Sequence, residues 1–372
     1  MVIEIRGTET KNKGAQLMLE TIVERLGGEF ELSATPIESA YDVRARLGLR
    51  QTLHLYRFPR AGSAVGNAVP GRLRQRYGLV ADRDITGVLD ASGFAYSDSF
   101  KAERSRREAI YGRAWARRGV PKVMLPQAFG PFEHEENRRW ATELLEQAVL
   151  IFARDTTSAE HLSRLSLSTP VLIFPDFTIG VSAANIEPPV AEPYLAVVPN
   201  TKVITSDVAG VRAYTQDLVD YSLTAAQRGL AVVVIVHDAG DRSIADAVSE
   251  ATRAEVFHSE EPRVLKAVLG HAEAVVASRF HSIVGALSQG VPTLALGWSH
   301  KYRELLNDFG VPEWLISVGE DPVARLGALL GDDSAIGRLQ DNRKRLIERV
   351  DDMWRLTIAE LRTSNHRASA NC

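Results

Sequence analysis

The feature that most constrains the fold is a pair of apolar runs joined by a helical segment in the second half of the chain. Residues 273–277 (EAVVA) and 292–296 (PTLAL) have the length and side chains of buried strands. Residues 281–289 carry apolar side chains at helical spacing, and Gly290 follows as a normal helix C-terminus. A strand, a loop, a helix and a strand in this order predict a parallel βαβ unit.

Polar side chains follow both strands of this unit. Ligands of parallel folds bind at the carboxyl ends of the strands, which is where Ser278, Arg279 and His281 fall. Lys301 follows the second strand and opens onto the same edge. Arginine offers a fork of donors to carboxylate or phosphate, helix amides attract negative charge, and lysine adds a point charge. The residues therefore predict an anion site, and the alternative is a solvated loop pair.

Strand-like and helix-like segments alternate along both halves of the chain, whose 372 residues suffice for two domains. The alternation predicts two doubly wound, parallel-sheet, Rossmann-like α/β domains that face a cleft, the arrangement called GT-B. Besides the two strands above, we expect strands at residues 2–6, 87–91, 122–125, 149–153, 170–174, 194–198, 231–236 and 255–258.

The domain limits follow from breaks in this alternation. Residues 1–182 form the N-terminal domain, and residues 183–193, rich in alanine and proline, form a linker. Residues 194–335 form the C-terminal domain. Residues 336–372 begin with a charged helix that packs back on the N-terminal domain, and they end in a tail, 363–372, that we expect to be disordered.

Composition excludes several classes of protein. The net charge of -3, with 45% hydrophobic residues, is that of an ordinary soluble protein and does not favour nucleic acid. The sole cysteine, Cys372, cannot form an internal disulfide, and no Cys/His cluster has the spacing of a zinc site, so we expect no metal. The chain begins with an expected strand rather than a signal sequence. No apolar run approaches the length of about 20 residues that a membrane-spanning helix needs. We expect a cytoplasmic protein, which could still lie against the inner face of a membrane.

Residues 43–81 form a basic segment with eight arginines and no acidic residue. Tyrosine, phenylalanine, glycine and proline are interleaved with the arginines. One interpretation is a solvated insertion in the N-terminal domain. The other is a surface that attracts an anionic acceptor or makes a peripheral contact with an anionic membrane.

Further polar residues lie at the ends of other expected strands. They are Asn12, which shares the loop after the first strand with Gly14, and then Asp90, Gln127, Arg154 and His237. A polar loop after the first strand of an α/β domain commonly binds phosphate or sugar, although this one is neither a P-loop nor a dinucleotide fingerprint. A plain turn at Gly14 and a helix-capping role for Asp90 are the structural alternatives.

In this order, the motifs resemble those of the polysaccharide pyruvyl transferase family. The matching stretches are Asn-Lys-Gly at 12–14, Pro-Gln-Ala-Phe-Gly-Pro at 126–131, Arg-Asp at 154–155, Ser-Arg-Phe-His at 278–281 and Gly-Val-Pro at 290–292. The resemblance spans both halves of the chain. One departure is the sequence Asp-Ala-Ser-Gly at 90–93, where family members usually have three glycines.

The resemblance implies a transferase that moves the pyruvyl group of phosphoenolpyruvate onto a saccharide, giving a cyclic pyruvate ketal on a cell-surface polysaccharide or glycolipid precursor. No cofactor is implied besides phosphoenolpyruvate as co-substrate, and the acceptor is free or lipid-linked. Arg279 and His281 would be catalytic, with His281 as general acid. The implied phosphoenolpyruvate site comprises Arg154, Arg279, His281, Lys301 and Ser278, and the implied acceptor site comprises Asn12, Gly14, Asp90, Gln127 and His237. The hydroxyl-activating base is left open between Asp90 and His237.

Two other functions stay open. A GT-B glycosyltransferase or a sugar-nucleotide epimerase would hold a nucleotide diphosphate at the helix that starts near His281. An inactive glycan-binding relative would explain the changed loop at 90–93, although Arg154, Arg279 and His281 are all retained. The sugar, its hydroxyl pair and the oligomeric state do not follow from the sequence.

Overall fold

The computed structural model describes residues 1–53, 66–183, 185–187, 190, 193–203, 208–297 and 300–370. Its contacts divide the chain into two compact units, and neither is a single continuous stretch. The first unit consists of Met1–Thr10, Met18–Phe177 and Val350–Cys372, and the second consists of Lys11–Leu17 and Thr178–Arg349. The boundary after Phe177 precedes the linker expected at 183–193, part of which lies outside the described residues.

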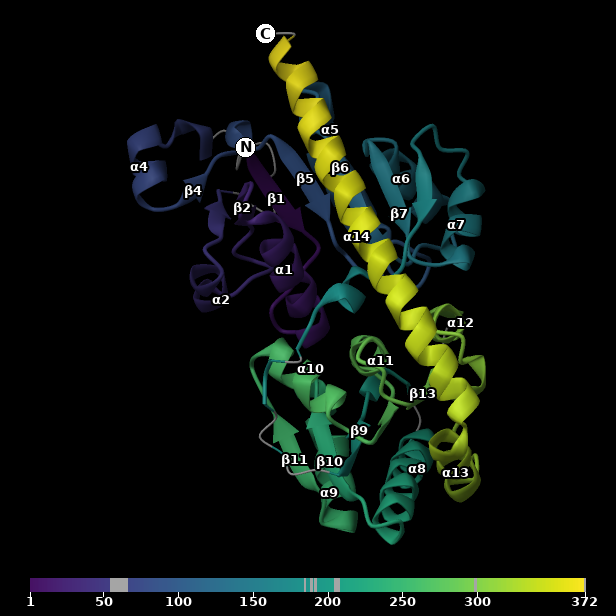
Figure 1. Cartoon of the computed structure of the whole chain (residues 1–372). Coiled ribbons are helices and arrows are strands. Elements are labelled where there is room, and N and C mark those ends of the chain that lie inside the picture. The colour runs from purple at the N-terminus through teal and green to yellow at the C-terminus, as the bar shows by residue number, and fades with distance from the viewer. Residues whose placement is uncertain are drawn as a thin grey trace. The chain divides into compact units, whose positions relative to one another are not determined.

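The first unit is built on a parallel sheet (Figure 1). Within the described residues the sheet has eight strands in the order β4-β3-β2-β1-β5-β6-β7-β8. Because β1 lies between β2 and β5, the winding of the chain reverses there, the place where open α/β sheets bind ligands. The strands are β1 (Val2–Arg6), β2 (Glu31–Ala34), β3 (Arg50–Thr52), β4 (Leu79–Val80), β5 (Gly87–Asp90), β6 (Lys122–Gln127), β7 (Leu150–Ala153) and β8 (Val171–Ile173).

The helices of the first unit connect these strands and cover an apolar core. They are α1 (Lys13–Leu26), α2 (Tyr41–Arg46), α4 (Gly71–Arg76), α5 (Glu103–Arg117), α6 (Glu135–Leu145) and α7 (Thr156–Ser163). One buried cluster joins Met124 and Ile151 of the sheet to Leu144 of α6 and Leu162 of α7. Asp155 caps α7 because its side chain accepts a hydrogen bond from the backbone of Ser158.

The second unit has its own parallel sheet (Figure 1). Among the described residues its order is β11-β10-β9-β12-β13-β14, so the winding reverses at β9, between β10 and β12. The strands are β9 (Tyr194–Val198), β10 (Ala231–Val236), β11 (Glu255–His258), β12 (Ala274–Ala277), β13 (Thr293–Leu296) and β14 (Leu315–Ile316). The helices are α8 (Val208–Gln227), α9 (Arg242–Thr252), α10 (Pro262–Gly270), α11 (Phe280–Leu287), α12 (His300–Asp308) and α13 (Pro322–Gly331).

The last helix, α14 (Asp333–Ala370), contributes to both units. Its residues up to Arg349 belong to the second unit, and those from Val350 belong to the first. In the first unit, the ring of Trp354 lies 5.5 Å from that of Phe177, and Leu361 is fully buried. The helix runs through residues 363–370, where a disordered tail was expected. No helix in the described part of the chain has the length and apolarity needed to span a membrane.

The basic segment 43–81 differs from the expected insertion. Its described residues supply β3 and β4, which pair with the sheet of the first unit. Several of its arginines are neutralised locally, because Arg46 pairs with Glu20 and Arg50 pairs with Glu31. Residues 54–65, with Arg57 and Arg60, lie outside the described part. A membrane contact through 43–81 therefore stays a prediction.

Candidate active site

Three strands of the second sheet end close to its winding reversal, and polar residues follow each of them. Asn200 comes after β9, His237 directly after β10, and Ser278 directly after β12. The strand order places β9 between the other two. A cluster of polar loops at such a reversal is the expected position of a ligand site in an α/β unit.

Arg279 is held at this edge by two aspartates that the sequence interpretation missed. Its Nε and Nη2 donate to the two carboxylate oxygens of Asp241 over 2.7 and 2.6 Å, while its Nη1 lies 3.6 Å from Asp238. Asp241 is fully buried and also accepts a hydrogen bond from the backbone of Thr201. A buried, two-point contact of this kind fixes the plane of the guanidinium.

Ser278 supports the loop. Its hydroxyl accepts a hydrogen bond from Tyr214 over 2.8 Å, and its carbonyl accepts from Asn200 and from Tyr302. The residue is fully buried. Ser278 therefore shapes the turn that presents Arg279, and its contact with the substrate, implied by the resemblance, stays a prediction.

His281 packs against the start of α1, which belongs to the same unit by its contacts. A Cβ atom added to Gly14 would lie 2.2 Å from the Nδ1 of His281, closer than real atoms approach. Asn12 accepts hydrogen bonds from the backbone of Gly14 and Ala15 and so orders the first turn. Asn12 and Gly14 thus support His281, and their role as acceptor ligands stays a prediction.

Lys13, between these two residues, brings another positive charge to the same unit. It is buried, and its Nζ donates to Glu260 over 2.6 Å. Glu260 is 79% exposed and lies 2.9 Å from the Nε2 of His258. The hydrogen bond from Lys13 lowers the pKa of Glu260. A buried lysine paired with an exposed carboxylate can exchange that partner for an incoming anion at modest cost.

His237, which directly follows β10, is buried as Arg279 and Lys13 are. Burial and, to a smaller extent, the electrostatic effect of Arg279, His281 and Lys13 together lower the pKa of His237 to about 3. The imidazole is therefore neutral at pH 7 and able to accept a proton. Because such electrostatic effects weaken with distance, Arg279, His281 and Lys13 lie in the neighbourhood of His237.

Lys301 also belongs to this unit. Its Nζ lies 5.6 Å from the ring centre of Phe280 and 5.3 Å from that of Tyr302, the range of cation–π contacts. The neighbouring residues 298 and 299 are outside the described part of the chain. Within the described ranges, no group of three histidine, cysteine or acidic side chains has a metal-binding arrangement.

The remaining predicted residues lie in the first unit. Asp90, at the end of β5, accepts hydrogen bonds from the hydroxyls of Ser92 and Tyr96 over 2.6 and 2.7 Å. Gln127 donates to the carbonyl of Asp90 over 3.4 Å. Asp90 is fully buried, so it orders the loop that departs from the family pattern.

Arg154 follows β7 in the first unit and is almost fully buried. Its Nη1 lies 3.2 Å from Asp176, so its partner is Asp176 and not the adjacent Asp155. No local sequence pattern indicates that pairing, because the two residues lie on different connections. Asp241 had a weak signal, since it belongs to the polar run His-Asp-Ala-Gly-Asp that follows β10.

Fold and site together define a GT-B-like protein with two parallel-sheet α/β units and a cationic site at one sheet edge. The solved structures agree. A UDP-GlcNAc 2-epimerase from Neisseria meningitidis matches with a TM-score of 0.61 at 11% identity, covering 97% of this chain and 99% of that one. A glycosyltransferase from Rickettsia africae ESF-5 matches with a TM-score of 0.59 at 8% identity, covering 98% of each chain. At such identities the likeness shows the fold alone.

The family is shown by sequence. The family model for polysaccharide pyruvyl transferase matches residues 12–300. The chain belongs to this family, as its motifs predicted. No curated protein matches it.

Proposed function

We propose that this transferase moves the pyruvyl group of phosphoenolpyruvate onto two hydroxyls of one sugar, forming a cyclic ketal on a polysaccharide or glycolipid precursor. The observation that carries the proposal is the convergence of Lys13, Arg279 and His281 on the buried, neutral His237, in a member of this family. Phosphoenolpyruvate carries its carboxylate and its phosphate on the same carbon atom. Such a ligand needs more than one cation at short range.

Each cation would contribute differently to binding. The guanidinium of Arg279 is already oriented by its hydrogen bonds to Asp241, whereas Lys13 must first break its hydrogen bond to Glu260. Lys301 would supply a further point charge. From the family resemblance we also propose that Arg154 binds phosphoenolpyruvate, and exchanging its guanidinium for lysine tests that role by itself.

The proposed chemistry has two additions. His281 gives a proton to the methylene carbon of phosphoenolpyruvate, which makes the neighbouring carbon electrophilic, and a sugar hydroxyl bonds there while losing its proton. A second hydroxyl then bonds to the same carbon as the carbon–oxygen bond to phosphate breaks, and phosphate leaves with the electron pair. Of the two hydroxyl protons released, one restores His281 and the other is carried away on phosphate or solvent.

We favour His237 over Asp90 as the group that takes the first hydroxyl proton. The carboxylate of Asp90 is already engaged by Ser92 and Tyr96, whereas His237 is neutral. The negative charge of bound phosphoenolpyruvate would offset the surrounding cations and raise the pKa of His237 from about 3 toward the working pH. His237 would then become a stronger base only when the co-substrate is present.

Calorimetric titration with phosphoenolpyruvate tests the proposal. Arg279→Lys keeps the charge opposite buried Asp241 but loses the fork, so we expect binding at least tenfold weaker. His281→Gln should bind within a fewfold of the wild type and lose transfer to the acceptor. Arg212→Lys, an exposed change on α8, is the control and should bind as the wild type does.

UDP-GlcNAc is the competing ligand in the same titrations. Binding of UDP-GlcNAc without phosphoenolpyruvate would make the chain a glycosyltransferase or epimerase relative and remove the roles given to His281 and His237. A protein that binds saccharide but neither of these ligands would be an inactive glycan-binding relative.

A further inference from the structure

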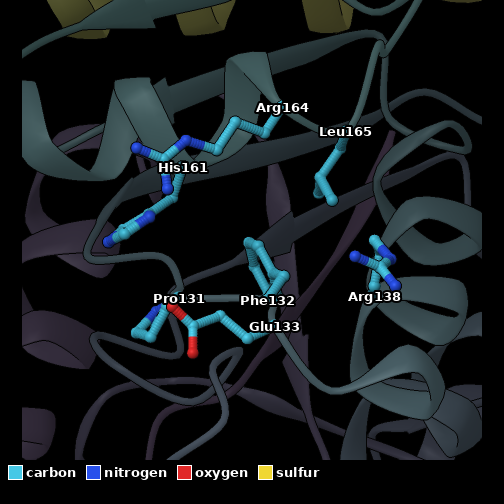
Figure 2. A pocket seen from close by; sticks show the side chains of 7 residues that line it. All are labelled: Pro131, Phe132, Glu133, Arg138, His161, Arg164 and Leu165. Atoms are coloured by element: carbon cyan, nitrogen blue, oxygen red, sulfur yellow. The ribbon is translucent and has the colours of Figure 1, made fainter.

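A pocket of about 140 Å³ in the first unit has no role in the proposed chemistry (Figure 2). Phe132 and Leu165 form its apolar part, and both belong to the buried core of the unit. Because these side chains are packed from behind, the floor is rigid. Pro131, at the end of the Pro-Gln-Ala-Phe-Gly-Pro motif, lies beside them.

Polar side chains from two helical segments surround this floor. Arg138 comes from α6, while His161 and Arg164 come from α7 and the residue after it. Figure 2 shows Arg138 on one side of Phe132, and His161 with Arg164 on the other. Glu133 adds a carboxylate at the rim.

The two arginines are available for a ligand. Both are exposed, and among the described residues neither guanidinium makes a hydrogen bond or an ion pair. Many other arginines of the first unit do have acidic partners, such as Arg113 with Glu143 on neighbouring helices. Two such cations facing one small hollow attract an anionic group, and one rim carboxylate offsets only part of their charge.

His161 is held in place by the motif. A Cβ atom on Gly130 would lie 2.6 Å from the Cβ and Cγ of His161, and Gly130 has a φ of +77°. Only glycine allows both this backbone conformation and this close approach. The motif therefore fixes the imidazole at the wall of the pocket.

We infer that this pocket binds one pyranose ring that carries an anionic substituent, a carboxylate or a phosphate. Pockets for drug-sized ligands enclose about 300–1,000 Å³, so a pocket of about 140 Å³ suits a single ring. The Phe132 ring faces the C–H side of the sugar, Arg138 and Arg164 bind the anionic group, and His161 and Glu133 bind hydroxyls. That this sugar is part of the acceptor rests on the proposed function, whereas the binding itself does not.

The test is an NMR titration of the full chain with methyl β-D-glucuronide, glucose 6-phosphate, methyl β-D-glucoside and inorganic phosphate. We expect at least one anionic sugar to bind tenfold or more tighter than the neutral glucoside and than phosphate alone. Arg138→Ala and Arg164→Ala should each weaken that binding at least fivefold. Arg139→Ala is the matched control, because Arg139 is the next residue on α6 and contacts the ring of Trp140 instead.

Three results would overturn the inference: no binding of either anionic sugar, phosphate binding as tightly as glucose 6-phosphate, or an equal loss in Arg139→Ala. Phosphoenolpyruvate is titrated into the same samples. If it binds and the sugars do not, the pocket inference fails and the proposed function stands. If the anionic sugars bind and phosphoenolpyruvate does not, the pocket inference stands and the proposed function fails.

Discussion

Gly14 shows how one backbone position can serve a side chain distant in sequence. Its missing Cβ leaves room for the imidazole of His281. We expect Gly14→Ala to displace that ring and to reduce transfer at least tenfold, because a reacting group must be positioned within a fraction of an ångström. Activity assays and phosphoenolpyruvate titration on the same variant measure the effect.

The matched change for that experiment is Gly337→Ala. Gly337 lies inside α14, and an added Cβ would meet no atom within 4 Å. Alanine should therefore leave activity unchanged and stabilise the helix by about 0.5–1 kcal/mol. Equal activity in Gly14→Ala and the wild type would show that the ring of His281 is not positioned by this contact.

Glu260 competes with any anion that Lys13 binds. Glu260→Gln removes the competing charge, so phosphoenolpyruvate should bind about threefold to fivefold tighter. This change in affinity corresponds to the free energy of an exposed ion pair. The neighbouring Glu261→Gln should change nothing, since its side chain has no partner among the described residues. Weaker binding in Glu260→Gln, measured by calorimetry, would instead mean that Glu260 holds Lys13 in its working position.

Individual site residues were predictable only where the motif itself carries the chemistry. Arg279 and His281 lie in one triplet at a strand end, and periodicity located that strand end. Asp241 and Glu260 were missed because each joins its partner from another connection of the sheet. No local spacing records such a pairing, and an aspartate or glutamate in a polar loop has many ordinary explanations.

Among the elements, α14 has a testable contribution to the first unit. Trp354 is 3% exposed and packs edge-on against Phe177. Trp354→Ala should cost about 3–5 kcal/mol of stability, because a large buried ring is lost and leaves a cavity. Leu356→Ala, on the exposed side of the same helix, should cost less than about 1 kcal/mol. Urea unfolding followed by circular dichroism compares the two, and similar midpoints would contradict the packing role.

The apolar strands were predicted well, and the two short strands of the basic segment were not. β9 and β10 begin and end where the apolar runs do, since buried parallel strands are apolar on both faces. β3 and β4 have three and two residues and lie in a basic stretch without an apolar run. Their place in the sheet comes from pairing with β2 and with each other, which sequence periodicity does not encode.

At the scale of the whole molecule, His237 makes stability depend on pH. Its pKa is about 3 in the folded protein, and an unfolded histidine titrates near 6.5. The unfolded chain therefore binds the proton first, and stability is lost as the pH falls from 6.5 toward 3. The loss at pH 5 relative to pH 7.5 should be about 2 kcal/mol. His237→Gln should lack this dependence when unfolding is measured from pH 5 to 8.

Glu4 acts in the opposite direction, so the difference between wild type and variant is the quantity to compare. Burial raises the pKa of Glu4 to about 7, although Arg6 opposes that shift. Its contribution to stability therefore falls as the pH rises from about 4.5 to 7. This contribution cancels when His237→Gln is compared with the wild type at each pH. An equal pH slope in both proteins would contradict the assignment to His237.

Because α14 contributes residues to both units, it affects the order in which the units can fold during synthesis. The interior of the first unit includes Trp354 and Leu361, which a ribosome adds only after residues 178–349 of the second unit. The second unit likewise uses residues 11–17, which are made long before its sheet. Domains commonly fold in the order in which they are translated. Here the first unit cannot close its core until the residues of the second unit have been translated, so the nascent chain carries an apolar surface around Phe177 for chaperones to cover.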